Sequence, residues 1–311
     1  MTIGELRVLY LDNHVVNLKD RLGTTRRLQR YLAPFDALSL GALTKMQVIQ
    51  WHQEIGRTRG FTAANQALQQ LRAMYQKAQD WELYDGKNPA DRVKKFSKHS
   101  RARFLQANEL PWLLKSLADE RPTVETYFLC LLLTGARRDE ARTLQWTHLD
   151  LERALWHKPT TKTTPHTIPI PAQLVTRLRT LPRVCEWVFP STPCSKNGMR
   201  AGLWSVTAVE KKWQQLRRRV GLTDVRIHDL RRTAASWLAI NGSNLPVIQQ
   251  MLNHRSLSST QVYARLSVAP VRLALDDQAE RMLGIPVQPT PAPVIAPPIA
   301  PAIERMEWPG E

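Results

Sequence analysis

Apolar residues recur every three or four positions through much of the first hundred residues, which is the period of an α-helix packed on one side. The longest such stretch covers residues 62–81, and its expected inward positions are Leu68, Leu71, Met74, Tyr75 and Ala78. A helix is also predicted over 43–55, with Thr44 as its N-cap and Met46, Ile49 and Ile55 on its inner side. Another covers 24–35, where Pro34 ends it.

The second half of the chain combines helical periods with one β-like stretch. Residues 148–171 are rich in β-branched residues interrupted by Pro and Thr, which predicts a short sheet or hairpin. Helical patterns precede this stretch and follow it, at 108–120, 123–144, 171–181, 206–221, 228–242, 245–253 and 258–266. The predicted fold is therefore mainly α, with a small β-sheet or hairpin in the second half.

Changes in composition suggest where the domains begin and end. We expect a helical domain over 1–95, a basic linker at 96–103 and a second domain over 104–285. The basic run from Arg92 to Arg103 has few apolar residues and reads as an exposed connector. Residues 286–311 are rich in proline and are expected to form a disordered or polyproline tail.

Composition and charge narrow the classes of function. A formal net charge of +17 and a pI near 10.3 favour a polyanionic partner, most often nucleic acid. The 43% hydrophobic content excludes a fully disordered chain. The longest apolar run, near Tyr127–Leu133, is too short to span a membrane. No secretory signal opens the sequence, and Cys130, Cys185 and Cys194 form no CxxC pair, so we expect reduced thiols and a cytoplasmic protein, bacterial or phage-encoded.

Candidate chemistry lies in the second half, as cations and imidazoles followed by a tyrosine. The sequence has no Walker loop, GxGxxG, HExxH or acidic metal cluster. Arg137 follows TGA at the end of the apolar helix, with Glu140 three residues later, and Lys162 lies in a predicted turn between strands. Two further pairs, taken one by one, fit ordinary surface or packing roles as well as functional ones: His228 with Arg231, and His254 with Tyr263.

Together these pieces resemble the tyrosine recombinase family, also called phage integrases. TGAR, the hairpin lysine, HDLRRT, LNH and a tyrosine nine residues after that histidine occur in the order and spacing of the family. The helices of residues 2–100 resemble the family's core-binding domain, and RFLQANELPWLL resembles the opening of its catalytic domain. The resemblance implies a helical core-binding domain followed by a tyrosine-recombinase catalytic domain. We expect the additional N-terminal domain of larger phage integrases to be absent.

The resemblance assigns a role to each matching residue. Tyr263 matches the nucleophile, Arg137 and Arg231 match the arginines on the scissile phosphate, and Lys162 matches the hairpin lysine, the candidate general acid. The other matches are His228, the best-placed base, His254, at the position held by His or Trp, and Glu140, a structural support. Fixed cations aimed at developing negative charge stabilise a phosphoryl transition state, so neither a metal, ATP nor another cofactor is implied.

The implied activity is site-specific DNA recombination through a 3′-phosphotyrosyl intermediate and a Holliday junction. Double-stranded DNA is the expected substrate. The chain is expected to be a tetramer on DNA, and a monomer or weak dimer when free; a role for an accessory DNA-bending protein stays open, and no membrane partner is expected. A type IB topoisomerase-like enzyme would use the same chemistry but rejoin the same strand. A non-catalytic DNA-binding protein is a further alternative, although all the family's catalytic positions are occupied.

Some positions lie outside the family's common pattern or its catalytic set. Asn253 stands where a glycine is common, and Arg232 where a histidine is common. Lys211, Lys212, Arg217 and Arg218 are candidates for DNA backbone contacts. After the tyrosine, residues 269–283 predict an amphipathic helix with Leu275, Ala279 and Met282 on one side, which packs either on its own domain or, as in relatives, on the next protomer.

Overall fold

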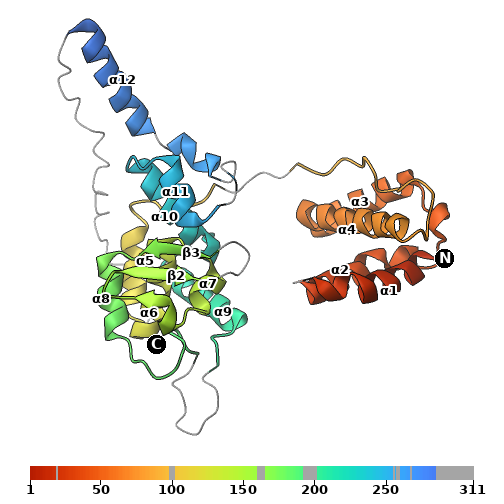
Figure 1. Ribbon diagram of the computed structural model, residues 1–311, viewed down its shortest axis with the longest axis horizontal. Helices are drawn as coiled ribbons and strands as arrows, with labels where there is room; N and C mark the ends of the chain where they lie inside the picture. The colour runs from red at the N-terminus through yellow and green to blue at the C-terminus, as the bar shows by residue number, and fades with distance from the viewer. Residues whose placement is uncertain are drawn as a thin grey trace, which may run out of the picture. The chain divides into compact units, whose positions relative to one another are not determined.

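The computed structural model divides the chain into two compact units, Met1–Arg101 and Ala102–Glu311 (Figure 1). It describes residues 1–18, 20–97, 102–159, 165–191, 202–254, 256, 260–266 and 268–284. Lys162 and the proline-rich segment from residue 286 lie outside these ranges, so the expectations for them are not tested. Across the described ranges, every helix falls short of the length or apolar character needed to cross a bilayer.

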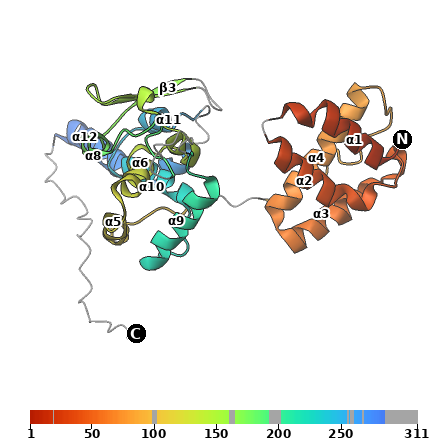
Figure 2. The same cartoon turned by 90° about the horizontal axis from the view of Figure 1, so that it is seen from below.

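The first unit is a helical bundle (Figure 2). It consists of the helices α1 (Ile3–Asn13), α2 (Arg21–Leu32), α3 (Lys45–Arg59) and α4 (Phe61–Asp80), with single 3-10 turns η1 (Val15–Asn17), η2 (Ala33–Phe35) and η3 (Leu40–Ala42). Helix α4 contacts the other three helices and supplies the centre of the core. Its predicted inward residues Leu68, Leu71, Met74, Tyr75 and Ala78 are all fully buried, so this prediction is confirmed.

The prediction for α3 is confirmed at its start and wrong for one inward residue. Thr44 caps the helix, and its hydroxyl accepts a hydrogen bond from the backbone N–H of Gln47. Met46 is 61% exposed, whereas Val48 is fully buried. The packing against α4 selects the face of Val48 and Ile55, which lie seven residues apart and therefore on one side of the helix.

The basic run begins within this unit, where its described basic residues are exposed as expected but two apolar residues pack inward. Val93 is buried, and the ring of Phe96 stacks between those of His52 and Phe61. The amide of Asn65 fixes the backbone of Phe96 from both sides: it donates to the carbonyl at 2.9 Å and accepts from the N–H at 2.9 Å. Apolar packing and backbone hydrogen bonds therefore hold this end of the run on the helical bundle.

The other end of the run is fixed to the second unit. The Arg103 guanidinium forms a salt bridge with Glu109 at 2.5 Å and with Asp224 at 2.7 Å. Its side chain is only 20% exposed. The positive charge of Arg103 is therefore neutralised by carboxylates of the second unit.

The second unit packs helices around a central apolar helix. Its elements are α5 (Leu110–Ala118), α6 (Pro122–Thr134), α7 (Arg138–Arg142), η4 (Trp146–His148), β1 (Leu149–Asp150), β2 (Leu155–Lys158), β3 (His166–Pro169), α8 (Ala172–Thr180), α9 (Val206–Arg219), α10 (Ile227–Ile240), α11 (Leu245–Leu252), η6 (Gln261–Leu266) and α12 (Val268–Leu283). The large side chains Tyr127, Phe128, Phe189 and Trp213 form the centre of its core.

The predicted sheet is confirmed as a three-stranded antiparallel sheet in the order β1-β2-β3. Strands β2 and β3 pair with Trp156 opposite Ile168 and Lys158 opposite His166. Trp156, Ile168 and Lys158 are buried, so the inner face of this hairpin carries one lysine among apolar side chains. Strand β2 ends at Lys158 and β3 begins at His166, and Lys162 stands between them in the sequence, outside the described residues.

The C-terminal segment differs from the prediction at the tyrosine. Residues 261–266 form the 3-10 helix η6, where an α-helix was predicted. The helix α12 that follows is formed as predicted, and Figure 1 shows it extending from the rest of its unit. Leu275 is 58% exposed and Met282 is 73% exposed, so the described part of its apolar side is not covered by its own chain.

Candidate active site

Arg137 is placed by a sharp break between α6 and α7. Gly135 ends α6 with φ +61°, a left-handed conformation that costs other residues free energy. A Cβ at this position would lie 3.0 Å from Cδ2 of Leu252, so a larger residue would also push against α11. Arg137 then forms the N-cap of α7, with its side chain 35% exposed and able to reach a substrate.

Glu140 lies between Arg137 and a lysine that sequence reasoning missed. Its Oε1 accepts from the Arg137 guanidinium at 2.6 Å, and its Oε2 accepts from the ammonium of Lys158 at 3.1 Å. Burial alone would raise the pKa of this carboxyl, but the charges of Lys158 and Arg137 and their hydrogen bonds lower it to about 2. Lys158 could have been found from its spacing, because it lies two residues after Trp156 on the inner side of a strand.

Arg231 is the most deeply buried of the predicted catalytic residues that the structure describes, with 4% exposed. Its guanidinium donates to the carbonyl of Gly135 at 2.6 Å and to the carbonyl of Leu252 at 2.5 Å. Burial first, and then the charge of Arg137, lowers its pKa to about 10. The guanidinium has five N–H donors, so these two bonds fix its plane and leave other donors for a substrate.

The two histidines lie near both arginines. His228 stands in the first turn of α10 and is exposed, and His254 follows α11 with its Nδ1 3.0 Å from the hydroxyl of Thr260. Part of the His228 ring reaches solvent, but the partial loss of water around both imidazoles, together with the charge of Arg231, lowers the pKa of each, that of His254 to about 4. Both rings are therefore neutral near pH 7 without a substrate and can accept a proton.

Tyr263 lies on η6 and is 7% exposed. Its ring packs with Ala235 and Ala239 of α10 and with Ile248 and Leu252 of α11. Burial raises the pKa of its phenol, and the charges of Arg231 and Arg232 oppose that rise. The predicted nucleophile therefore lies beside the arginine site of its own chain.

The structure thus brings together five of the six predicted catalytic residues: Arg137, His228, Arg231, His254 and Tyr263. They lie on or next to four elements, α7, α10, α11 and η6, and each interacts electrostatically with at least one of the others. Lys162, the sixth, lies outside the described residues. A cleft of about 620 Å³ opens beside Arg137, Glu140 and His228. This arrangement can hold a doubly coordinated anion next to a phenol and neutral imidazoles.

Comparison with known proteins agrees with this geometry. The model of the phage integrase family matches residues 103–269, which is more than half of the chain. The chain belongs to the phage integrase family.

The integrase of Salmonella phage P22 is 28% identical over 197 residues, which cover 60% of this chain and 49% of that protein. The tyrosine recombinase XerC of Rhizobium meliloti strain 1021 is 32% identical over 104 residues, which cover 33% of this chain and 32% of that protein. The matches therefore span about half and about a third of these relatives.

Solved structures in this family share the fold. The Tn1549 transposon integrase in complex with a circular intermediate DNA has a TM-score of 0.72 at 16% identity, covering 90% of this chain and 100% of that one. A lambda integrase dimer bound to a COC′ core site has a TM-score of 0.67 at 16% identity, covering 83% and 97%. This likeness confirms the predicted fold class, a mainly helical chain with a small sheet.

The departures from the pattern of the phage integrase family have physical explanations. Asn253 has φ +49°, in the left-handed region, and asparagine adopts this conformation more readily than most residues other than glycine. Arg232 donates to the carboxylate of Asp229 at 3.0 Å, so it adds charge near Tyr263 while its own position is fixed. Asn253 therefore suits the backbone turn after α11, and Arg232 is a positive charge with a fixed position.

The proposed backbone-contact residues on α9 fall into two groups. Lys212 forms a salt bridge with Glu120 at 3.1 Å, and Arg217 donates to the carbonyls of Thr223 and Val225. Lys211 and Arg218 are exposed, and neither has an ion pair within the described ranges. Lys211 and Arg218 are therefore the better candidates for contact with a DNA backbone.

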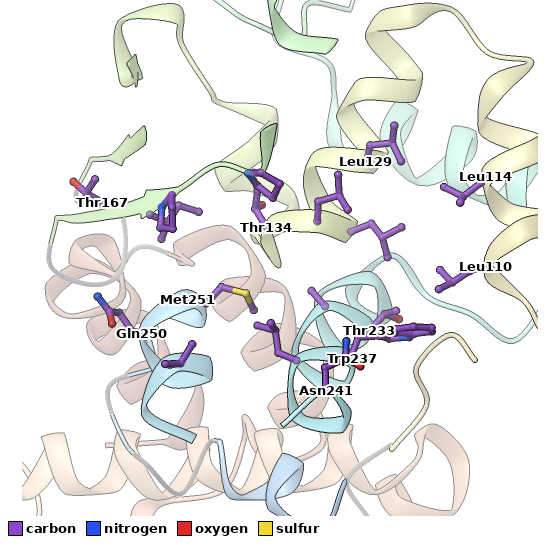
Figure 3. Close-up of a pocket in the computed structure, with 18 residues that line it drawn as sticks. Leu110, Leu114, Leu129, Thr134, Thr167, Thr233, Trp237, Asn241, Gln250 and Met251 are labelled. Atoms are coloured by element: carbon purple, nitrogen blue, oxygen red, sulfur yellow. The ribbon is translucent and has the colours of Figure 1, made fainter. Parts of the chain in front are cut away.

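A second, apolar cavity of about 610 Å³ lies between α5, α6, α10, α11 and β3. Figure 3 shows it extending from Leu110 and Leu114 at one end to Thr167 and Gln250 at the other. Its described lining includes none of the predicted catalytic residues. This groove fits an apolar side chain or helix face better than a phosphate.

The lowered pKa of His254 predicts a pH-dependent stability. An unfolded chain would bind a proton on this residue near pH 6.5, whereas the folded chain binds it only near pH 4. The unfolded state therefore gains more protons as the pH falls from 6.5 towards 4, and folding loses stability over that window. Urea unfolding at pH 7 and pH 5 is expected to show this loss.

Between pH 7 and pH 5 the contribution of His254 is about 1–2 kcal/mol. His254→Gln removes the titrating group, so its free energy of unfolding is expected to change less between the two pH values. His228 remains in that variant and keeps part of the dependence. An equal pH dependence in both proteins would contradict the prediction.

Proposed function

We propose that this chain is a site-specific DNA recombinase, which cuts and rejoins double-stranded DNA through a covalent bond to Tyr263. The observation that carries the proposal is the placement of a buried tyrosine beside Arg231, with Arg137 and two neutral imidazoles in the same electrostatic cluster. Such a cluster suits attack on a phosphodiester better than hydrolysis by a metal-bound water.

In the proposed step, the phenolic oxygen of Tyr263 attacks the scissile phosphorus, and the bond to the 5′-oxygen breaks. The phenolic proton passes to His228, whose lowered pKa keeps it able to accept a proton at neutral pH. Arg137 and Arg231 donate to the non-bridging oxygens, where negative charge develops. Each such donor is worth about 2.7–4 kcal/mol in a well-studied oxyanion hole. The raised pKa of Tyr263 explains why a base is required.

The departing 5′-oxygen needs a proton, and we assign Lys162 as its donor on the basis of the family resemblance. The 3′-phosphotyrosyl bond keeps the energy of the broken bond, so a 5′-hydroxyl of another strand can reverse the attack. Rejoining to a new partner would then yield a Holliday junction without ATP. His254 and Glu140 are assigned supporting roles, His254 near the phosphate and Glu140 behind Arg137.

We propose that both basic units bind the same duplex and that four chains assemble on two duplexes. The net charge of +17 supports a DNA partner. A lambda integrase structure with a similar fold is a tetramer bound to a Holliday junction. The uncovered apolar side of α12 and the apolar groove lined by Leu114, Trp237 and Met251 support contacts between chains of such a tetramer. The carboxylate of Glu140, which contacts Arg137, is also paired with Lys158, so its negative charge is offset within the protein.

Covalent capture tests the proposal and also finds the unknown target. The full chain is mixed with a library of nicked duplexes whose flanks are randomised, and SDS then removes DNA that is not covalently bound. The expected result is an enriched sequence attached to the peptide that contains Tyr263, identified by mass spectrometry. The proposal fails if no DNA survives denaturation on the protein. Relaxation of supercoiled plasmid without strand exchange would instead favour a topoisomerase-like activity.

A further inference from the structure

Lys158 is a buried ammonium in the part of the second unit where the predicted catalytic residues meet. Its side chain is 9% exposed, and Nζ lies 4.4 Å from the centre of the Trp156 ring. Removing an ammonium from water costs several kcal/mol, so a lysine at this depth requires a compensating charge. That charge is the Glu140 carboxylate, which is itself only 12% exposed.

The same carboxylate connects Lys158 to the surface of the site. One oxygen of Glu140 accepts from Lys158 and the other from Arg137, whose side chain is 35% exposed. The backbone N–H of Arg137 also donates to Glu140, at 3.1 Å. Three groups therefore form a continuous chain from the protein interior to the cleft, with a single carboxylate in its middle.

Other charged groups around Lys158 do not replace this link. Cys130 of α6 and Arg231 of α10 act on it electrostatically, and the thiol of Cys130 has its pKa raised to about 12 by burial, so it is neutral. Arg231 is a like charge held by two backbone carbonyls. In the described residues, Glu140 is the only carboxylate that forms an ion pair with Lys158.

We propose that Lys158 is a positioning residue for DNA cleavage: it holds the Glu140 carboxylate ionised and oriented, and Glu140 in turn fixes the guanidinium of Arg137 toward the phosphate. This inference rests on the proposed function. Lys158 is a different residue from Lys162, the assigned proton donor, and its ammonium is buried at the end of β2. Its positive charge also offsets that of Glu140, so the site keeps the full charge of both arginines for the transition state.

The first test is Lys158→Met, which keeps the length and apolar stem of the side chain but removes its charge. Single-turnover cleavage of the nicked duplex recovered by covalent capture is expected to slow at least about tenfold, while the Kd for that duplex changes less than threefold. The pH profile is a second readout. Loss of one cation raises the pKa of the buried Glu140, so the variant should lose further activity as the pH falls from 7 to 5, where the wild type keeps Glu140 ionised.

A double-mutant cycle with Glu140→Gln separates positioning from a direct role. If Lys158 acts through Glu140, the double variant cleaves no more slowly than Glu140→Gln alone. Multiplying losses would overturn the inference, and so would a Lys158→Met variant with the rate and pH profile of the wild type. Should Lys158→Met not fold, the double variant removes both buried charges and is expected to fold, and cleavage by that double variant at the wild-type rate would overturn the inference.

The experiment also needs a matched control variant and the activity of the wild type as its reference. Arg177→Met removes a cation from the Arg177–Glu125 ion pair of the same unit, and it is expected to leave cleavage and its pH profile unchanged. If the wild type itself forms no covalent adduct, the proposed function fails. If the wild type is active and Lys158→Met matches it, only the positioning role fails.

Discussion

Tyr263→Phe is expected to abolish covalent attachment to DNA while leaving DNA binding within about threefold of the wild type. The substitution removes one oxygen from a side chain that is 7% exposed and packed against α10 and α11, so the ring keeps its place. Without the phenolic oxygen no nucleophile is left at that position. Removal of a catalytic nucleophile costs on the order of 10⁵-fold or more in rate in a well-studied hydrolase.

The measurement is the yield of SDS-resistant protein–DNA complex on the captured duplex, with the Kd measured by gel shift on an unnicked duplex. Tyr84→Phe is a suitable control, since its hydroxyl donates only to the carbonyl of Lys87 near the surface. That variant should form adduct at the wild-type rate. Persistent adduct in Tyr263→Phe would show that another residue is the nucleophile.

Arg231→Lys is expected to lower cleavage at least about a hundredfold and to destabilise the fold as well. The guanidinium donates to the carbonyls of Gly135 and Leu252, which leaves three of its five N–H donors for a substrate. A lysine has one ammonium, which cannot satisfy two carbonyls and also contact a phosphate in bidentate fashion. Loss of one charged hydrogen bond to a buried carbonyl, with the carbonyl left unsatisfied, costs about 2–3 kcal/mol.

Two measurements separate these effects. Urea unfolding gives the change in stability, and single-turnover cleavage at a temperature where both proteins are folded gives the change in rate. Arg177→Lys, in a partly exposed ion pair with Glu125, is the control and should alter neither by much. An Arg231→Lys enzyme that is destabilised but cleaves within a few fold of the wild type would mean that the buried arginine has only a structural role.

Local features of the fold could be predicted well from sequence. The inner face of α4, the cap at Thr44 and the hairpin of β2 and β3 depend on residues close together in the chain, and all three are confirmed. The error at Met46 has a different cause. Helix α3 offers apolar residues on more than one side, and only its contact with α4 selects the face that becomes buried.

The charged residues show the clearest difference between what the sequence predicts and what the tertiary structure contains. Lys212 and Arg217 look like DNA contacts in sequence, yet they bind Glu120 and backbone carbonyls within the protein. Arg103 likewise forms salt bridges inside its unit. A lysine or arginine is recognised from sequence, but the presence of a carboxylate beside it depends on segments far away in the chain.

The sequence by itself determined the helical and strand segments and, through the order of its motifs, the family and the expected catalytic residues. Hydrophobic period and capping act over a few residues, so they can be read locally. Only the tertiary structure decided that Arg231 is held by two carbonyls, that Tyr263 lies beside it on the same chain, and that Lys158 is buried against Glu140. Burial and ion pairing depend on which distant segments pack together, and no local pattern specifies that.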